Sequence, residues 1–295
     1  MTTIPDRLTR RGLLQRSVCL AVGALAPPDL VSLAVPAKSR VVLVRDARVL
    51  DGRGINGNVL ADMLDATVCK LLGENDPVHA WRQVVRPHDV VGIKSNVWRH
   101  LPTPPALEQA ISRRLVDAGV KAEAVGIDDR GVLEHPVFAR ATALINARPM
   151  RTHHWSGLGT CIKNYVMFVP DPWSYHGNAC ENLGVIWRKP EVDGKTRLNV
   201  LVMLTPLFHG TGPHHFNRAY TWPYAGLLAS RDPVAVDTVG AAIITARRKA
   251  HFGEERPIAP SPHHIEVADR RFGLGTSSLD RIELVRLGDS RDNLI

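Results

Sequence analysis

Short apolar runs alternate with segments of helical periodicity in the first half of the chain, and this alternation restricts the fold more than any other feature. The runs at residues 40–44, 89–93 and 122–127 have the length and composition of buried strands. Between them, residues 58–72 and 106–118 place apolar side chains at helical spacing. Strands that alternate with helices form parallel sheets with crossover helices. We therefore expect an α/β fold with a mostly parallel sheet.

The second half of the chain is richer in loops, although the same pattern continues. We expect a helix over residues 161–168, a strongly apolar strand over 198–204 and a long helix over 233–249. The sequence has no internal repeat and no low-complexity linker. Residues 38–295 are therefore expected to form a single α/β domain.

Residues 1–37 look like a twin-arginine export signal, a segment that addresses a folded protein to the twin-arginine translocase. Arg10 and Arg11 precede a weakly apolar run at 17–26, and small residues at 35–37 suit cleavage. The run is too short for a lasting membrane anchor, which needs roughly 20 apolar residues. We expect a periplasmic or otherwise exported protein, with an ordinary secretory signal or a basic amphipathic helix as the alternatives.

Charge restricts the class of ligand. The whole chain carries +8, and the first 37 residues contain four arginines and two aspartates, so the remaining 258 of the 295 residues keep +6. Their basic residues are scattered among acids and do not form a stripe with interleaved aromatics, which argues against nucleic-acid binding. A small anionic ligand suits the excess of positive charge.

The cysteines are too few for a usual iron–sulfur cluster, which takes four thiolates. Cys69, Cys161 and Cys180 remain after residue 37, without a Cys-x-x-Cys spacing. Cys161 and Cys180 could form a disulfide in an exported protein. Cys161 could instead be a nucleophile or a buried structural thiol.

Histidine is abundant, with 13 in the chain, and imidazole is a common ligand of divalent transition metals. No His-Glu-x-x-His register is present, and adjacent histidines often lie exposed. The metal ligands that we predict lie in the second half of the chain: His153, His176, His209, His214 and His215.

Two Lys–Asn pairs follow expected strand or turn ends. Lys94 and Asn96 come after the run at 89–93, and Lys163 and Asn164 follow a glycine-bearing turn at 157–159. Ligands of parallel sheets collect beyond the carboxyl ends of strands. We expect the two lysines to be catalytic, the two asparagines to bind the substrate, and the glycines to bring backbone donors close to an anion.

The segment 230–237 begins a helix, with Asp232 as the cap and Pro233 at the first position. Asp237 lies one turn further, among small and apolar residues that indicate burial. It is either a catalytic carboxylate or a structural hydrogen-bond acceptor.

Three segments together resemble a known family, the domain of unknown function 362. They are the string Leu-Leu-Ala-Ser-Arg-Asp-Pro-Val-Ala-Val-Asp at 227–237, the strand end at 91–96, and His153 ten residues before Lys163. The resemblance covers most of residues 40–250 and implies an α/β fold. Many members also carry a ferredoxin-like cluster domain, for which this chain lacks the cysteines.

Together these features predict a small-molecule reaction on an anionic substrate, either metal-assisted or using a Lys or His for proton transfer, with Lys94, Lys163 and Asp237 as the expected catalytic residues. The alternative is a non-catalytic periplasmic subunit that binds a metal or docks on a redox partner.

Overall fold

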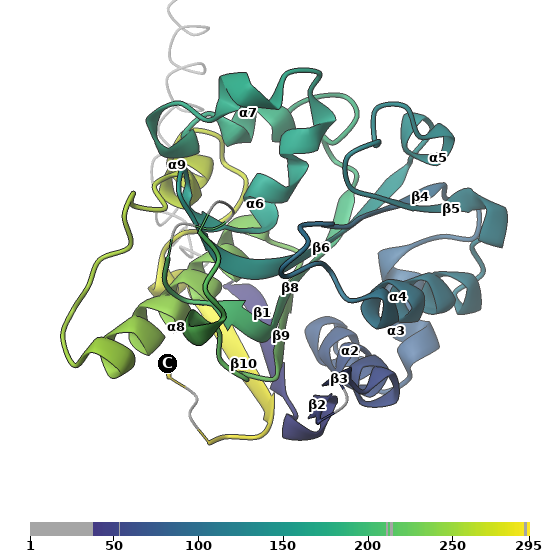
Figure 1. The fold of residues 1–295 in the computed structure, drawn as a ribbon. Helices are drawn as coiled ribbons and strands as arrows, with labels where there is room; N and C mark the ends of the chain where they lie inside the picture. The colour runs from purple at the N-terminus through teal and green to yellow at the C-terminus, as the bar shows by residue number, and fades with distance from the viewer. Residues whose placement is uncertain (1–37, 53, 211, 213–214, 292–293) are drawn as a thin grey trace, which may run out of the picture. The chain divides into compact units, whose positions relative to one another are not determined.

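A mixed eight-stranded sheet forms the centre of the molecule (Figure 1). The computed structural model describes residues 38–52, 54–210, 212, 215–291 and 294–295, so the expected export signal lies outside the described residues. The strands follow the order β10-β1-β9-β8-β6-β4-β5, with β7 paired to β6. Their bounds are β1 (Ser39–Arg45), β4 (Val91–Lys94), β5 (Val125–Asp128), β6 (Ala143–His153), β7 (Gly157–Gly159), β8 (Thr196–Leu207), β9 (Gly226–Ser230) and β10 (Ile282–Gly288).

Most neighbouring strands run parallel, which confirms the expected α/β fold. The block β5-β4-β6-β8 is parallel throughout, as is the pair β1–β10. β9 is antiparallel to both β8 and β1, because a loop rather than a crossover helix joins β8 to β9. A separate small hairpin pairs β2 (Leu50–Asp51) with β3 (Gly54–Ile55).

Helices cover both faces of the sheet. Figure 1 shows α2, α3 and α4 together on one side and α8 on the other. The bounds of the helices are α2 (Gly57–Leu72), α3 (Pro77–Val84), α4 (Pro105–Asp117), α5 (Pro136–Ala139), α6 (Cys161–Asn164), α7 (Leu183–Trp187), α8 (Pro233–Phe252) and α9 (His264–Arg270).

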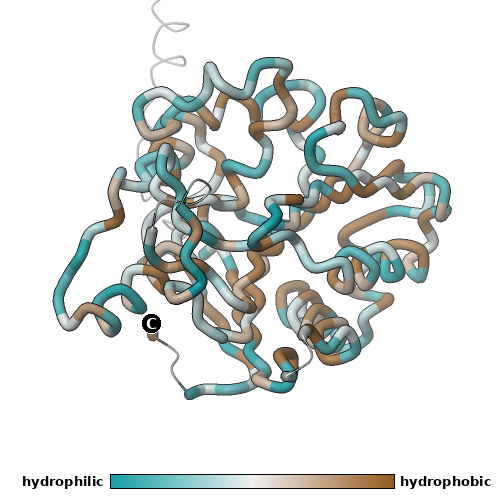
Figure 2. Tube along the Cα trace, viewed as in Figure 1, coloured by the Kyte–Doolittle hydropathy of each residue, from teal (hydrophilic) through white to brown (hydrophobic). Residues whose placement is uncertain are grey.

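The inner strands β4, β6 and β9 are buried along their whole length, as helices on both faces of the sheet require, whereas the edge strands β5 and β10 are partly exposed. In β1, Val42 and Val44 belong to the core beneath α2, whereas Val41 and Leu43 belong to the core beneath α8. Figure 2 shows predominantly apolar central strands and a largely hydrophilic connection between α8 and α9.

Side-chain caps fix where the long helices begin. Asp232 accepts the backbone N–H groups of Val234 and Ala235 at 2.9 and 2.8 Å, which confirms its predicted role at the start of α8. For α2 the cap is Asn56, which accepts the N–H groups of Asn58 and Val59. The expected helix at 161–168 is divided into α6 and a 3-10 turn, η3 (Tyr165–Phe168). Within the described residues, no helix is long and apolar enough to cross a membrane.

Candidate functional site

A polar cavity of about 450 Å³ opens at the carboxyl ends of β4, β5 and β6. The strands are parallel and in register, so their ends meet at one edge of the sheet, where ligands of such sheets bind. Tryptophans and short loops complete the walls. The polar and charged residues of the lining are Asn96, Asp129, Arg130, Arg148, Arg151, His153, Lys163, Asn164 and His176.

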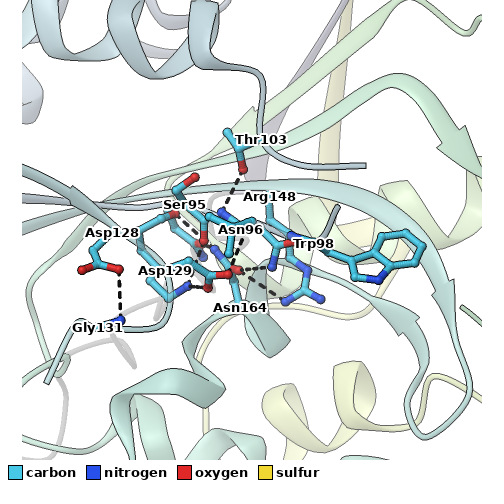
Figure 3. Close-up of polar contacts among 12 residues, drawn as sticks. Ser95, Asn96, Trp98, Thr103, Asp128, Asp129, Gly131, Arg148 and Asn164 are labelled. Carbon is cyan, nitrogen blue, oxygen red and sulfur yellow. Dashed lines mark hydrogen bonds and ion pairs between the residues drawn. The ribbon is translucent and has the colours of Figure 1, made fainter. Parts of the chain in front are cut away.

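Lys94, the last residue of β4, forms a buried ion pair with Asp129, whose carboxylate is labelled in Figure 3. Lys94 contacts the Asp129 carboxylate and also donates to the Ser95 carbonyl at 2.8 Å, while Asp129 accepts the Val97 N–H at 2.9 Å. Burial lowers the pKa of Lys94 to about 8, although the charge of Asp129 opposes the shift. Burial acts to raise the pKa of Asp129, but Lys94 outweighs it and the pKa is lowered. The predicted catalytic ammonium of Lys94 is therefore already neutralised by a neighbour.

A chain of amides holds two arginines in place. Asn164 donates to Asn146 Oδ1 at 2.8 Å, and its Oδ1 accepts from both Asn96 and Arg148 at 3.3 Å. Asn96 Oδ1 accepts from Arg151 Nη1 at 3.0 Å. The two asparagines that we predicted to bind substrate thus line the cavity, and each also orients a guanidinium group.

Arg148 and Arg151 each bring one positive charge to the cavity, and both residues are almost fully buried, at 3% and 4% exposure. The Nε atom of each has no hydrogen-bond partner among the described residues, and no carboxylate there forms an ion pair with either group. Burial lowers the pKa of both arginines, and the charge of Arg148 lowers that of Arg151 further. Both groups therefore carry positive charge without a carboxylate partner among the described residues, although the Arg151 guanidinium lies over the Trp98 ring, 4.5 Å from its centroid.

An irregularity in β6 lets both arginines reach the same cavity. Side chains three apart on a regular strand point to opposite faces. Between Pro149 and Arg151 the pairing of β6 with β8 shifts register, from Pro149 opposite Val202 to Arg151 opposite Leu207. Arg148 and Arg151 consequently line one cavity, although they are three positions apart.

Gly159 leaves room for the two arginines of the cavity, and Gly157 leaves room for the backbone at Pro260. A Cβ at Gly159 would lie 2.8 Å from Arg148 Nη2 and 3.3 Å from Arg151 Cγ. Gly157 has φ +69°, and a Cβ there would lie 2.1 Å from the Pro260 carbonyl oxygen. The turn predicted to bring backbone donors to an anion instead leaves the space that a guanidinium occupies.

Lys163 adds a third buried cation, at 2% exposure, on the short helix α6. Its Nζ donates to Cys180 Sγ at 3.5 Å. Burial lowers the pKa of Lys163 to about 8, and the nearby Arg148 charge adds to the effect. Among the described residues it has no carboxylate partner, so it too offers charge to a ligand.

Asp237, which lies on α8, holds the start of α6 by direct hydrogen bonds. Its two carboxylate oxygens accept the backbone N–H groups of Cys161 and Ile162, both at 2.8 Å, and so cap the helix that carries Lys163. Burial raises the pKa of Asp237 to about 7, against the opposing effect of these hydrogen bonds. Asp237 is fully buried and does not line the cavity. Its position therefore favours the role of a structural hydrogen-bond acceptor over that of a catalytic carboxylate.

The histidines predicted to share a metal are divided between two places. His153 and His176 line the cavity, with ring centroids 6.4 Å apart, whereas His209 and His215 line a second cavity beside Arg248. His214 lies outside the described residues. Nowhere in the described part of the chain do three His, Cys, Asp or Glu side chains gather in a way that could hold a metal ion.

The three cysteines after residue 37 are free thiols, so Cys161 and Cys180 are not joined by a disulfide. Burial raises the pKa of Cys161 well above the ordinary value, with the charge of Asp237 adding to the shift. A protonated, fully buried thiol is a poor nucleophile. Cys161 is therefore a structural residue.

Sequence reasoning missed Arg148 and Arg151 as residues of the site. The strand that carries both arginines contains Asn146, Arg148 and Pro149, so it lacks the apolar run that marked the other strands. The available signal was the run 143–147 followed by two closely spaced arginines, at the same edge as Lys94.

Comparison with known proteins gave a match to a family model that covers part of the chain. Searches among curated proteins and among solved structures gave no match. A family model matches residues 127–242, a segment that begins in β5, ends in α8 and includes both arginines and Lys163. The match agrees with the family resemblance of the string 227–237, and the strand end at 91–96 lies outside it. The model that matches residues 127–242 is that of a domain of unknown function, DUF362.

Proposed function

We propose that the protein binds a small organic anion in the cavity at the carboxyl ends of β4, β5 and β6. One observation carries the proposal: Arg148, Arg151 and Lys163 are buried in the lining without a carboxylate partner among the described residues. An uncompensated buried charge costs several kcal/mol. A bound anion removes this cost by pairing with all three groups.

The remaining charges of the site do not supply that compensation. Asp129 is the acidic group of the lining, and Lys94 already neutralises it. Burial lowers the pKa of His153, and that of His176 to about 4, so both imidazoles are neutral at pH 7. The cavity therefore keeps a net positive charge, and guanidinium groups bind carboxylate and phosphate oxygens in pairs.

Isothermal titration calorimetry with inorganic phosphate and with citrate tests the proposal. We expect saturable binding that Arg148→Gln and Arg151→Gln each weaken by roughly tenfold or more, since each removes charge-assisted hydrogen bonds. Arg113→Gln is the matched control, because Arg113 is exposed on α4 and away from the cavity. The proposal fails if neither anion binds, or if the cavity variants bind as tightly as the control.

We also propose that residues 1–37 direct export of the folded protein by the twin-arginine route. The support is the sequence alone: the Arg10–Arg11 pair, the weakly apolar run and the small residues before position 38. Export of this kind requires the domain to fold in the cytoplasm. An anion bound there would therefore travel with the protein.

A further inference from the structure

The wall of the cavity beyond the cations is aromatic. Trp155 and Trp173 both line it, with ring centroids 4.8 Å apart and an edge-on arrangement, and His176 lies 4.5 Å from Trp155. Since His176 is neutral at pH 7, it adds ring surface here rather than charge. A single cavity thus joins a cationic part to an aromatic part.

Trp173 presents much of its ring to solvent, with 66% of the residue exposed. Large exposed aromatic surfaces are uncommon and favour contact with a ligand, because covering them releases water and adds ring–ring attraction. The ring is also held in place. Asp171 accepts the Trp173 N–H at 3.0 Å and the Ser174 hydroxyl at 2.9 Å, which fixes the turn that carries it. A ligand ring would meet a surface that is already formed.

The cationic part suits a doubly charged, tetrahedral anion better than a single carboxylate. It offers Arg148, Arg151 and Lys163, and the Nε atoms of both arginines lack an acceptor among the described residues. A phosphate monoester carries a charge of about −1.5 to −2 at pH 7 and three strong acceptor oxygens. A carboxylate has one charge and two oxygens. The count of buried donors thus matches the phosphate group.

We propose that the ligand is a phosphate monoester of an aromatic compound, with its phosphate on Arg148, Arg151 and Lys163 and its ring against Trp155 and Trp173. This inference rests on the proposed anion-binding function and specifies the ligand of the same cavity. The phosphate places the ligand, and the ring distinguishes it from other phosphates.

Calorimetry with three probes separates the two parts: inorganic phosphate, phenyl phosphate and benzoate. We expect phenyl phosphate to bind roughly tenfold tighter than inorganic phosphate, the size of effect that one aromatic contact and its buried surface provide. Benzoate, with the ring but a single charge, should bind more weakly than phenyl phosphate. Trp173→Ala should abolish the advantage of phenyl phosphate over inorganic phosphate, so that the ratio of the two affinities falls to about one.

Leu279→Ala, at an exposed apolar residue outside the cavity lining, is the control for loss of surface. The inference is overturned if phenyl phosphate binds no tighter than phosphate, if Trp173→Ala leaves their ratio unchanged, or if benzoate equals phenyl phosphate. In each of these cases the anion still binds, so the proposed function stands. If no probe binds, the proposed function itself has failed.

Discussion

Gly159 leaves the space that the guanidinium of Arg148 occupies, because a Cβ at position 159 would lie 2.8 Å from Arg148 Nη2. Gly159 on β7 pairs with Arg151 of the antiparallel strand β6, and Arg148 lies three positions before Arg151 on that strand. The absence of a side chain at Gly159 therefore leaves room for the Arg148 guanidinium in the cavity.

We expect Gly159→Ala to weaken anion binding by roughly tenfold, because the methyl group displaces Arg148 and with it a charge-assisted hydrogen bond. Calorimetry with inorganic phosphate measures the change. Gly52→Ala is the matched control, since no atom lies within 4 Å of a Cβ at that position. Equal affinity in the two variants would contradict the packing argument.

Replacement of Asp237 by Ala should destabilise the domain. The backbone N–H groups of Cys161 and Ile162 would lose their acceptor in a fully buried place, at about 1–3 kcal/mol for each unsatisfied group. Urea unfolding measures the loss. Asp76→Ala provides a comparison, because it removes the cap of α3, which accepts the His79 N–H from an exposed position, and should cost about 1 kcal/mol. A smaller loss for Asp237→Ala than for Asp76→Ala would refute this assignment.

The stability of the domain should depend on the titration of Asp237. Its folded pKa is raised to about 7 from an ordinary value of 3.8, so the folded state binds the proton more tightly than the unfolded state. The stabilisation is fully present below pH 3.8 and is lost as the pH rises through 7. The free energy of unfolding of the wild type should therefore fall relative to that of Asp237→Asn between pH 4 and pH 8. Parallel curves for the two proteins would show that Asp237 does not titrate there.

Anion binding should weaken above pH 8. The pKa of Lys163 is lowered to about 8, so its ammonium loses its proton over this range and one attractive charge disappears. Calorimetry of phosphate binding from pH 7 to pH 9.5 measures the decline, and Lys163→Met should bind more weakly with a flatter profile. An undiminished decline in Lys163→Met would assign the titration to Lys94, whose pKa is also lowered to about 8.

Export should depend on the arginine pair at the N-terminus. We expect the double substitution Arg10→Lys, Arg11→Lys to retain the precursor in the cytoplasm, since the signal of this route requires the arginine pair itself. Cell fractionation with immunoblotting detects the retained precursor. The double substitution Arg7→Lys, Arg16→Lys keeps the same charge outside the pair and should be exported normally. Equal export of both variants would indicate an ordinary secretory signal.

The sequence predicted the fold well because burial on both faces leaves a visible pattern. The runs at 40–44, 89–93 and 122–127 became β1, β4 and β5, and the edge where ligands would collect followed from their direction. The strand β6 was not predicted because Asn146 and two arginines interrupt the apolar pattern that marks the other strands. A shift of register, which depends on the partner strand, then decides where those arginines point.

The candidate site was predictable in its location and not in its division of roles. Lys163 and Asn164 lie in the cavity because α6 follows the strand edge directly. Lys94 and Asp237 were also expected to be catalytic. In the structure, Lys94 instead pairs with Asp129, and Asp237 accepts the backbone N–H of Cys161 at the start of α6. Partners from distant segments decide these roles, and no local pattern identifies such partners.

Arg148 and Arg151 lie on a central strand, whereas Trp173 lies on a surface turn, so the two parts of the cavity differ in how easily they can be substituted. β6 is buried along its whole length, so its charges are fixed by the framework and change only at the expense of folding. Trp173 lies on a short surface turn that can be exchanged without disturbing the sheet. If the cavity binds the proposed ligand, substitutions at position 173 would change the surface that contacts its ring without altering the arginines on β6 that hold its phosphate.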